Sequence, residues 1–198
     1  MDKKNNLILA SGSFYRRTLL AKLGIPFEYA SPDIDEKRKP GEPLTDYVQR
    51  LSIEKALTVG RKYNDHLIIG SDQAATNSAG DLLTKPHTIE AANTQLSSLS
   101  GKTAMFYTGL TLYNSKTNNI QTITETTTVA FRELSAEQIQ SYITKDNPLD
   151  CAGSFKCESL GISLFKAIEG RDPNALIGLP LIALTEMLAV EGIDPLTW

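Results

Sequence analysis

The chain has 198 residues, of which 41% are hydrophobic and 22% are charged, so it can bury a proper core and disorder is not expected. Its formal net charge of −3 argues against general binding of a nucleic-acid polymer, because such proteins carry a basic surplus. No apolar stretch approaches the roughly 20 residues that span a membrane, and the opening MDKKNNLILA is too short in apolar residues for a secretory signal. A single domain over residues 1–198, cytoplasmic and without a membrane partner, is therefore expected.

The first predicted elements are a buried strand over residues 7–10 and a helix that Ser13 caps and Gly24 stops. Arg16 and Arg17 then stand in the first turn of the helix, where the helix dipole disfavours cations. One interpretation is a solvated surface pair. The other is an anion site, most simply for phosphate, because a strand, a small-residue turn and a helix N-terminus form such a cradle.

A second strand is predicted over residues 26–30, and the proline-rich, charged stretch SPDIDEKRKPGEP then predicts an irregular loop. The helix that begins near Thr45 carries an apolar stripe at helical spacing: Leu44, Val48, Leu51 and Val59. Lys55 projects into the middle of this stripe. Its ammonium either extends to water from a partly buried face or faces a ligand in a cleft.

A short buried strand over residues 67–69 is predicted to end in Gly70-Ser71-Asp72-Gln73, with a hairpin turn at 77–80. Asp72 would then close an apolar strand, flanked by small residues that let a ligand or metal approach its carboxylate. The alternative is an Asx-turn aspartate that accepts hydrogen bonds from nearby amides.

The remaining pattern predicts a helix over 88–99, two threonine-rich strands over 104–113 and 120–131, a helix from the capping box at 135–138 to about residue 145, and a final helix over 180–190. The two threonine-rich strands are typical of an antiparallel ribbon with one wet face. The chain has no internal repeat or clear linker, and its two cysteines lack further ligands at zinc spacing.

Acidic and basic side chains suggest a metal and a phosphate ligand. Asp33, Asp35 and Glu36 offer hard oxygen ligands on the predicted loop, which suit Mg²⁺ or Mn²⁺. Several cations stand beside turns or apolar faces rather than in a basic run, which suits a compact triphosphate site: Arg16, Arg17, Lys55 and Lys85.

A series of collinear stretches resembles the Maf family of nucleotide pyrophosphatases: LILASGSFYRRTLLAKLGIPFE, SPDIDE, EKA, LIIGSDQ, LTKP, FYTGL, AGSFKCESLG and GRDPNALIGLPL. These stretches cover nearly the whole chain. The resemblance implies an α/β fold like that of inosine triphosphate pyrophosphatase, with a mixed, elongated central sheet flanked by helices and a cleft between two lobes. It also implies hydrolysis of a nucleoside triphosphate to the monophosphate and pyrophosphate, a divalent metal ion, Mg²⁺ or Mn²⁺, and a homodimer.

The resemblance assigns roles to single residues. Asp72 occupies the position of the proton acceptor, and Glu36 with Asp72 would bind the metal ion. The phosphates would be held by Ser13, Arg16, Arg17, Lys55 and Lys85, the two lysines counting among the catalytic residues.

Three further positions match those that select the base in this family. Tyr15, Gln73 and Glu158 resemble the 7-methylguanosine triphosphate subgroup, since Tyr15 would stack on a positively charged purine and Glu158 would accept from the guanine N–H groups. The alternatives are a dTTP or UTP pyrophosphatase of the same fold and a non-catalytic nucleotide-sensing protein linked to division arrest. Phe14 and Thr84 depart from the family pattern, which usually has proline and glycine there.

Overall fold

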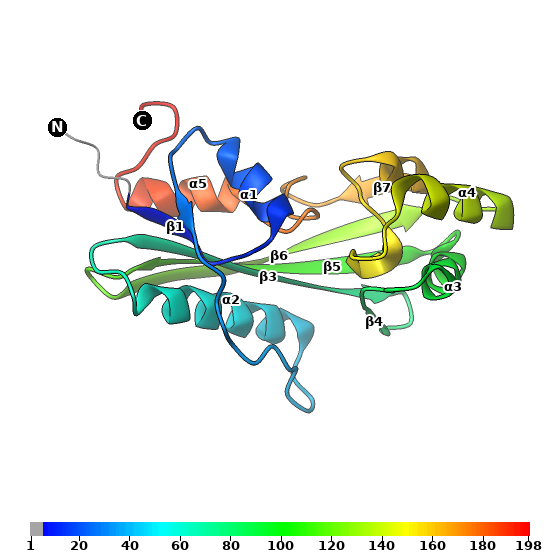
Figure 1. The fold of residues 1–198 in the computed structure, drawn as a ribbon, viewed down its shortest axis with the longest axis horizontal. Coiled ribbons are helices and arrows are strands. Elements are labelled where there is room, and N and C mark those ends of the chain that lie inside the picture. Colours follow the sequence, from blue (N-terminus) through cyan, green and yellow to red (C-terminus); the bar gives the residue numbers. More distant parts are fainter. Residues whose placement is uncertain (1–5) are drawn as a thin grey trace. The chain divides into compact units, whose positions relative to one another are not determined.

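The computed structural model describes residues 6–198 (Figure 1). Its helices are α1 (Phe14–Ala21), α2 (Leu44–Gly60), α3 (Ile89–Leu99), α4 (Ala136–Asp146) and α5 (Leu181–Val190), with short 3-10 turns η1 (Ala152–Ser154) and η2 (Leu160–Leu164). Its strands are β1 (Leu7–Leu9), β2 (Glu28–Tyr29), β3 (Leu67–Asn77), β4 (Leu82–Leu83), β5 (Thr103–Asn114), β6 (Asn119–Phe131) and β7 (Phe165–Glu169).

The strands of this described part form one sheet in the order β2-β1-β3-β5-β6-β7, with β4 paired to β3. β1 is parallel to β2 and β3, whereas β3 with β4 and β6 with β7 are antiparallel. The predicted α/β class with a mixed sheet and flanking helices is thus confirmed. The chain divides into two compact units, which are described separately below.

The first unit consists of the described residues up to Gln73 together with Thr108–Glu125 and Asp172–Trp198. Strand alternation divides its core, because successive side chains of a strand face opposite sides. Leu7 and Leu9 of β1 belong to a cluster with residues of α1 and α5. Ile8 packs with residues of α2 instead. The strands therefore lie between α1 and α5 on one side and α2 on the other (Figure 1).

β3 corrects one prediction. The strand does not end at Gly70-Ser71-Asp72-Gln73 but runs from Leu67 to Asn77, so Asp72 lies inside it. Gly70 explains why a polar, small-residue stretch stays in the strand, since a Cβ there would come 2.0 Å from the Ser52 carbonyl oxygen of α2. The missing side chain lets α2 pack directly on the strand. The strand therefore continues beyond the apolar residues from which its end was predicted.

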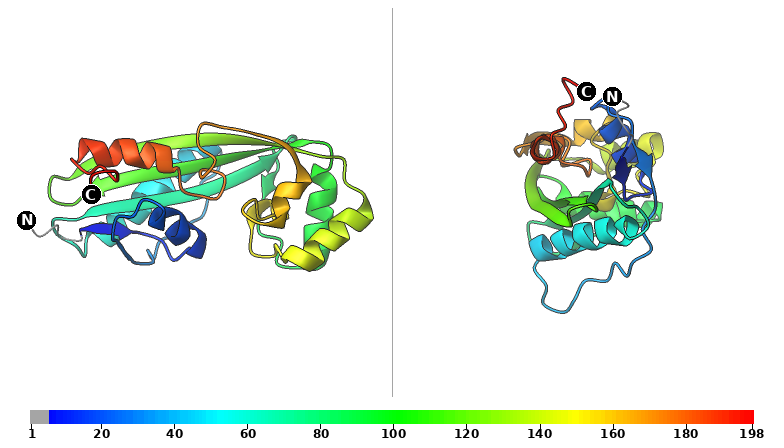
Figure 2. Two further views of the ribbon diagram at one scale, coloured as in Figure 1. Left: turned by 90° about the horizontal axis from the view of Figure 1, so that it is seen from above. Right: turned by 90° about the vertical axis from the view of Figure 1, so that its left-hand side faces the viewer.

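The second unit, Ala74–Tyr107 and Thr126–Arg171, has an aromatic core. Phe155 makes edge contacts with three other rings, at centroid distances of 5.4 Å to Phe106, 5.6 Å to Phe131 and 4.9 Å to Phe165. α3 contacts α4 and η1, and Figure 2 shows α3 and α4 side by side. This unit also contains β7 and the two 3-10 turns, which the sequence pattern did not predict.

Capping side chains explain the ends of the predicted helices. Ser135 and Gln138 form the expected capping box at the start of α4, and Thr88 caps α3 by accepting from the Ala91 amide. The hairpin turn between β3 and β4 is also present, because Asn77 Oδ1 accepts from the amides of Ala79 and Asp81.

Among residues 6–198, none of the helices has the length and apolar character needed to cross a membrane.

Candidate active site

Lys55 lies between two carboxylates that come from different parts of the first unit. Its Nζ is 2.6 Å from Asp72 Oδ1 and 2.8 Å from Glu36 Oε1. α2 carries Lys55, β3 carries Asp72, and the loop between β2 and α2 carries Glu36. Lys55 and Asp72 are only 5% and 7% exposed, so the ammonium is paired inside the protein, and the interpretation that it extends to water is wrong.

Alternation along β3 places Asp72 opposite α2. Ile68, Gly70 and Asp72 share one face of the strand, and both Ile68 and Gly70 contact α2. Lys55 occupies the apolar face of α2 that covers them, with Ala56 beside it. The apolar stripe that singled out Lys55 in the sequence is therefore the same surface that brings it to Asp72.

Burial raises the pKa of Asp72 above its ordinary value, because the desolvated carboxylate is disfavoured. The positive charges of Lys55 and Arg16 oppose this effect, whereas the negative charge of Glu36 adds to it. Among the described residues, the Asp72 carboxylate accepts from the Lys55 ammonium and not from a backbone amide, so Asp72 is not an Asx-turn aspartate. A buried carboxylate with a raised pKa beside cations is a typical candidate for a proton acceptor.

Arg16 is held at the same site through the backbone of a distant segment. Its Nε donates to the Gly178 carbonyl oxygen at 2.8 Å, and the Ser71 hydroxyl donates to the same oxygen at 2.9 Å. Burial lowers the pKa of Arg16, while the charges of Asp72 and Glu36 oppose the shift. Within the described residues neither Nη atom has an acceptor, so the outer part of the guanidinium is available to a ligand.

Ser13 caps α1 as predicted, its hydroxyl accepting from the Arg16 amide at 3.4 Å. The preceding turn is tied to Ser11, whose Oγ accepts from the Ser13 amide at 3.1 Å. The first turn of α1 contains no acidic residue, so the positive end of the helix is not neutralised by its own side chains. This local arrangement is suited to an anion.

Arg17, which the sequence placed with Arg16, occupies a different environment. Its guanidinium lies over the Tyr29 ring, 4.3 Å from the centroid, and 6.0 Å from the Phe14 centroid. Tyr29 and Phe14 are both more than half exposed. Arg17 therefore makes surface cation–π contacts, and its predicted phosphate contact stays a prediction. Phe14, which had no explanation in the sequence, forms one side of this contact and also packs edge-on against Tyr15.

Gln73 faces the side of β3 opposite to Asp72, and its amide orientation is fixed. Nε2 lies within 3.0 Å of the Thr108 hydroxyl and of the Ala175 and Leu176 carbonyl oxygens. Since carbonyl oxygens only accept, Nε2 must be the atom directed at them. Oε1 has no donor within the described residues, so Gln73 presents an acceptor.

Asp172 positions the segment that supplies these carbonyl oxygens. The carboxylate is 1% exposed; Oδ1 accepts from the Asn174 amide at 2.7 Å and Oδ2 from the Ile182 amide at 2.6 Å, at the start of α5. Asp172 therefore links two segments. One is the turn whose carbonyl oxygens accept from Arg16 and Gln73. The other is the start of α5, which has no side-chain cap of its own. Sequence reasoning assigned no role to Asp172; the available signal was an aspartate preceding an apolar helix.

The other two predicted site residues lie in the second unit. Lys85 is exposed in the segment between β4 and α3, and Glu158 is exposed in the turn between η1 and η2. Cys157 Sγ lies 3.6 Å from Glu158 Oε2. Burial raises the pKa of the Cys157 thiol to about 12, so at neutral pH it is a thiol rather than a thiolate.

The carboxylate oxygens at this site are suitable ligands for a divalent cation that binds together with phosphates. Glu36 and Asp72 converge on one positive group, the Lys55 ammonium, and Mg²⁺ is typically held by one or two carboxylates plus phosphate oxygens and water. Within residues 6–198, no group of three His, Cys, Asp or Glu could hold a metal ion alone. Asp33 and Asp35 are exposed, and Asp35 accepts from a backbone amide of its own loop.

Comparisons with known proteins agree with the resemblance. A family model described as Maf-like protein matches residues 6–191. The 7-methyl-GTP pyrophosphatase of Pseudomonas aeruginosa is 51% identical over 189 residues, which cover 96% of this chain and 98% of that protein. The 7-methyl-GTP pyrophosphatase of Pseudomonas putida is 52% identical over 187 residues, covering 94% and 97% of the two chains.

A solved structure of the Ham1 protein of Staphylococcus aureus is also similar. It matches with a TM-score of 0.45 and 13% identity, covering 64% of this chain and 72% of that one.

Proposed function

Because the chain belongs to the Maf-like protein family, we propose that it is a pyrophosphatase that hydrolyses 7-methyl-GTP to 7-methyl-GMP and pyrophosphate. The observation that carries the proposal is the buried Asp72 carboxylate with a raised pKa, held by Lys55 and attracted by Arg16. The choice of 7-methyl-GTP as the proposed substrate is supported by two relatives that are named 7-methyl-GTP pyrophosphatase.

In the proposed reaction a water oxygen forms a bond to the α-phosphorus, and the bond from that phosphorus to the α–β bridging oxygen breaks. Pyrophosphate leaves, and Asp72 takes the proton released by the water. A raised pKa makes this carboxylate a better proton acceptor than an exposed aspartate. Arg16 and Lys55 place positive charge where negative charge accumulates on the phosphoryl oxygens, which is the main requirement of such chemistry.

Glu36 and Asp72 are the residues proposed to hold Mg²⁺ or Mn²⁺. When bound, such an ion neutralises phosphate charge and polarises a phosphoryl oxygen. Lys55 attracts both carboxylates and so keeps two like-charged groups together at one place. Of the other proposed phosphate ligands, Ser13 stands at the N-terminus of α1, Arg17 lies over Tyr29, and Lys85 is exposed.

Tyr15, Gln73 and Glu158 are proposed to select the base, as their match to the family positions implies. A positively charged 7-methylguanine favours stacking on a tyrosine and contact with a carboxylate. Gln73 supports this assignment by presenting only its acceptor oxygen. The cytoplasmic location and the homodimer expected from the sequence are part of the same proposal.

A panel of nucleotides tests the function. Purified protein with Mg²⁺ is incubated with 7-methyl-GTP, GTP, dTTP, UTP and CTP, and inorganic pyrophosphatase converts released pyrophosphate to phosphate for detection. We expect kcat/KM for 7-methyl-GTP to exceed that for GTP by about tenfold or more, since one specific contact discriminates by about 1–3 kcal/mol. Product analysis should find the monophosphate and no diphosphate.

The other outcomes decide between the alternatives. Preferred hydrolysis of dTTP or UTP would overturn the base assignment and leave the pyrophosphatase chemistry in place. Binding of a nucleotide without turnover under any metal condition would instead favour the nucleotide-sensing protein.

A further inference from the structure

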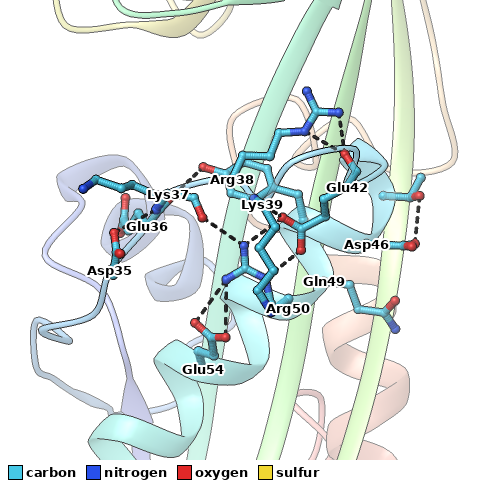
Figure 3. Close-up of polar contacts among 12 residues, drawn as sticks. Asp35, Glu36, Lys37, Arg38, Lys39, Glu42, Asp46, Gln49, Arg50 and Glu54 are labelled. Carbon is cyan, nitrogen blue, oxygen red and sulfur yellow. Dashed lines mark hydrogen bonds and ion pairs between the residues drawn. The ribbon is translucent and has the colours of Figure 1, made fainter.

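The loop that carries Glu36 is fastened to α2 by a network of hydrogen bonds around Arg50 (Figure 3). Arg50 Nε lies 2.6 Å from Glu42 Oε1, and Nη2 lies 2.9 Å from Oε2, a bidentate pair. Nη2 also donates to the Lys37 carbonyl oxygen at 3.1 Å. One side chain of α2 thus holds the loop at two points, at Lys37 directly after Glu36 and at Glu42 two residues before the helix.

The loop segment between these points is closed on itself. Glu42 Oε2 accepts from the Lys39 amide at 3.0 Å, and the Glu42 amide donates to the Lys39 carbonyl oxygen at 3.1 Å. The Arg38 side chain donates to the Glu42 carbonyl oxygen. Gly41, with a φ of 73°, provides the left-handed turn that this closure needs. The segment is therefore a compact turn whose position depends on the Arg50–Glu42 pair.

Tyr47 adds a second attachment at the backbone of Glu36 itself. Its hydroxyl donates to the Glu36 carbonyl oxygen at 2.7 Å, and its ring lies 5.7 Å from the Arg50 guanidinium carbon. Arg50 and Tyr47 thus hold two consecutive carbonyl oxygens of the loop.

The geometry of the pair makes it a strong attachment. The side chains of Arg50 and Glu42 are 17% and 10% exposed, so the charges are partly shielded from water and salt. Bidentate arginine–carboxylate pairs are among the strongest and most directional hydrogen bonds in proteins. In contrast, the Glu36 carboxylate that they position is 58% exposed and makes its contact to Lys55 from a proline-rich loop.

We propose that Arg50 and Glu42 are positioning residues that hold Glu36 at Lys55 and Asp72, and that they thereby set the affinity of the site for a divalent cation. The inference rests on the proposed function insofar as Glu36 is a metal ligand there. Without the pair, the loop samples other conformations, and Glu36 must be ordered when the cation binds. The cost of that ordering appears as weaker cation binding.

The test measures Mn²⁺ binding directly, by electron paramagnetic resonance of free Mn²⁺, without nucleotide but with inorganic phosphate present to supply phosphate oxygens. Arg50→Lys keeps the charge but removes the bidentate pairing, and Glu42→Gln keeps the size but removes the charge. Both variants should raise the dissociation constant for Mn²⁺ by about tenfold, the equivalent of about 1.4 kcal/mol. The double variant should be no weaker than either single one, because the two residues act as one unit.

Glu54→Gln is the matched control. Glu54 also pairs with Arg50, at 3.3 Å from Nη1 and from the same helix, and within residues 6–198 it has no hydrogen bond to the loop. This variant should keep the dissociation constant within about twofold of the starting protein, since exposed helix pairs contribute little. Hydrogen exchange at the Lys37 and Lys39 amides should accelerate in the Arg50 and Glu42 variants but not in the control.

Activity provides a readout that separates the two proposals. In Arg50→Lys, the Mg²⁺ concentration for half-maximal rate should rise about tenfold while kcat at saturating Mg²⁺ stays within about threefold, as expected for lost positioning rather than lost chemistry. Unchanged Mn²⁺ binding in folded Arg50→Lys and Glu42→Gln, or no Mn²⁺ binding by the starting protein, would overturn the positioning proposal. Failure of every nucleotide to be hydrolysed would overturn the proposed function while leaving the Mn²⁺ result intact.

Discussion

At Asp72, burial and neighbouring charge act in opposite directions on one carboxyl group. Desolvation raises the pKa, and the ammonium of Lys55 with the guanidinium of Arg16 lowers it. Removing one cation would therefore raise the pKa of Asp72 further. The site depends on this balance, because a proton acceptor must be ionised at the working pH and still hold the proton that it receives.

Replacing this carboxylate separates chemistry from binding. Asp72→Asn should lower kcat by about 100-fold or more, since a general base typically contributes 10²–10⁴-fold. Nucleotide affinity should persist, because Arg16 and Lys55 remain. In the starting protein, the acidic limb of kcat/KM should lie above the ordinary aspartate value of 3.8, because the raised pKa delays ionisation until higher pH. Steady-state rates across pH and calorimetric titration with nucleotide provide the measurements; an unchanged kcat would exclude Asp72 as the base.

Sequence reasoning identified the charged residues but not all of their partners. Lys55 stood out because it interrupts an apolar stripe, and Arg16 because it opposes a helix dipole; both signals are local in sequence. The Gly178 carbonyl oxygen that fixes Arg16 lies 162 positions away. Backbone acceptors have no residue-type signature, so neither this contact nor the carbonyl oxygens that orient Gln73 could be predicted from pattern.

Of the elements that the sequence did not predict, the turn before α5 contributes most to the candidate site. Its carbonyl oxygens bond Arg16, Ser71 and Gln73, and Asp172 holds it to the helix. Helix positions were predicted well because capping and 3.6-residue periodicity are strong local signals. The end of β3 was not predicted correctly, because Gly70 and Ser71 have the sequence pattern of a turn. The packing of α2 on Gly70 explains why they belong to the strand.

Asp172→Asn tests the turn as a positioning element. The amide places a donor where the carboxylate accepted from two backbone amides, so a loss of about 1–3 kcal/mol in unfolding free energy is expected. KM for 7-methyl-GTP should rise and selectivity over GTP should fall, with a smaller change in kcat. Asp194→Asn is the control, an exposed aspartate that accepts from the Leu196 amide. Lost stability with unchanged KM and selectivity would mean that Asp172 serves the fold alone.

Over the whole molecule, the two units have separate cores. The first packs Leu9, Leu20 and Leu184 around the strands, whereas the second is built on the ring cluster around Phe155. The composition predicted that a core would form, and the family resemblance implied two lobes, but neither predicted where the chain divides. No linker or change of composition marks it, because β3, β5 and β6 each contribute residues to both units.

Phe155→Leu should therefore affect the second unit selectively. Loss of the ring removes edge contacts to three neighbours and should cost about 1–2 kcal/mol. Hydrogen exchange followed by mass spectrometry should detect faster exchange in α3 and α4, with α5 and β1 unchanged. Phe14→Leu, at a side chain that is 67% exposed, should leave exchange in both units unaltered. A uniform acceleration in Phe155→Leu would mean that the two cores open together.

The alternation along β3 also limits which length changes evolution or design can introduce. Asp72 faces α2 and the Gln73 side chain faces the carbonyl oxygens before α5, so neighbouring positions on one strand serve opposite layers. A single inserted residue between Leu67 and Asp72 would exchange these two faces, moving the acid away from Lys55 and the amide toward it. A length change in the β2–α2 loop would cause no such exchange, but Arg50 holds the part of that loop between Glu36 and Glu42 in place. Heritable insertions and deletions should therefore be rare in β3 and in this part of the loop.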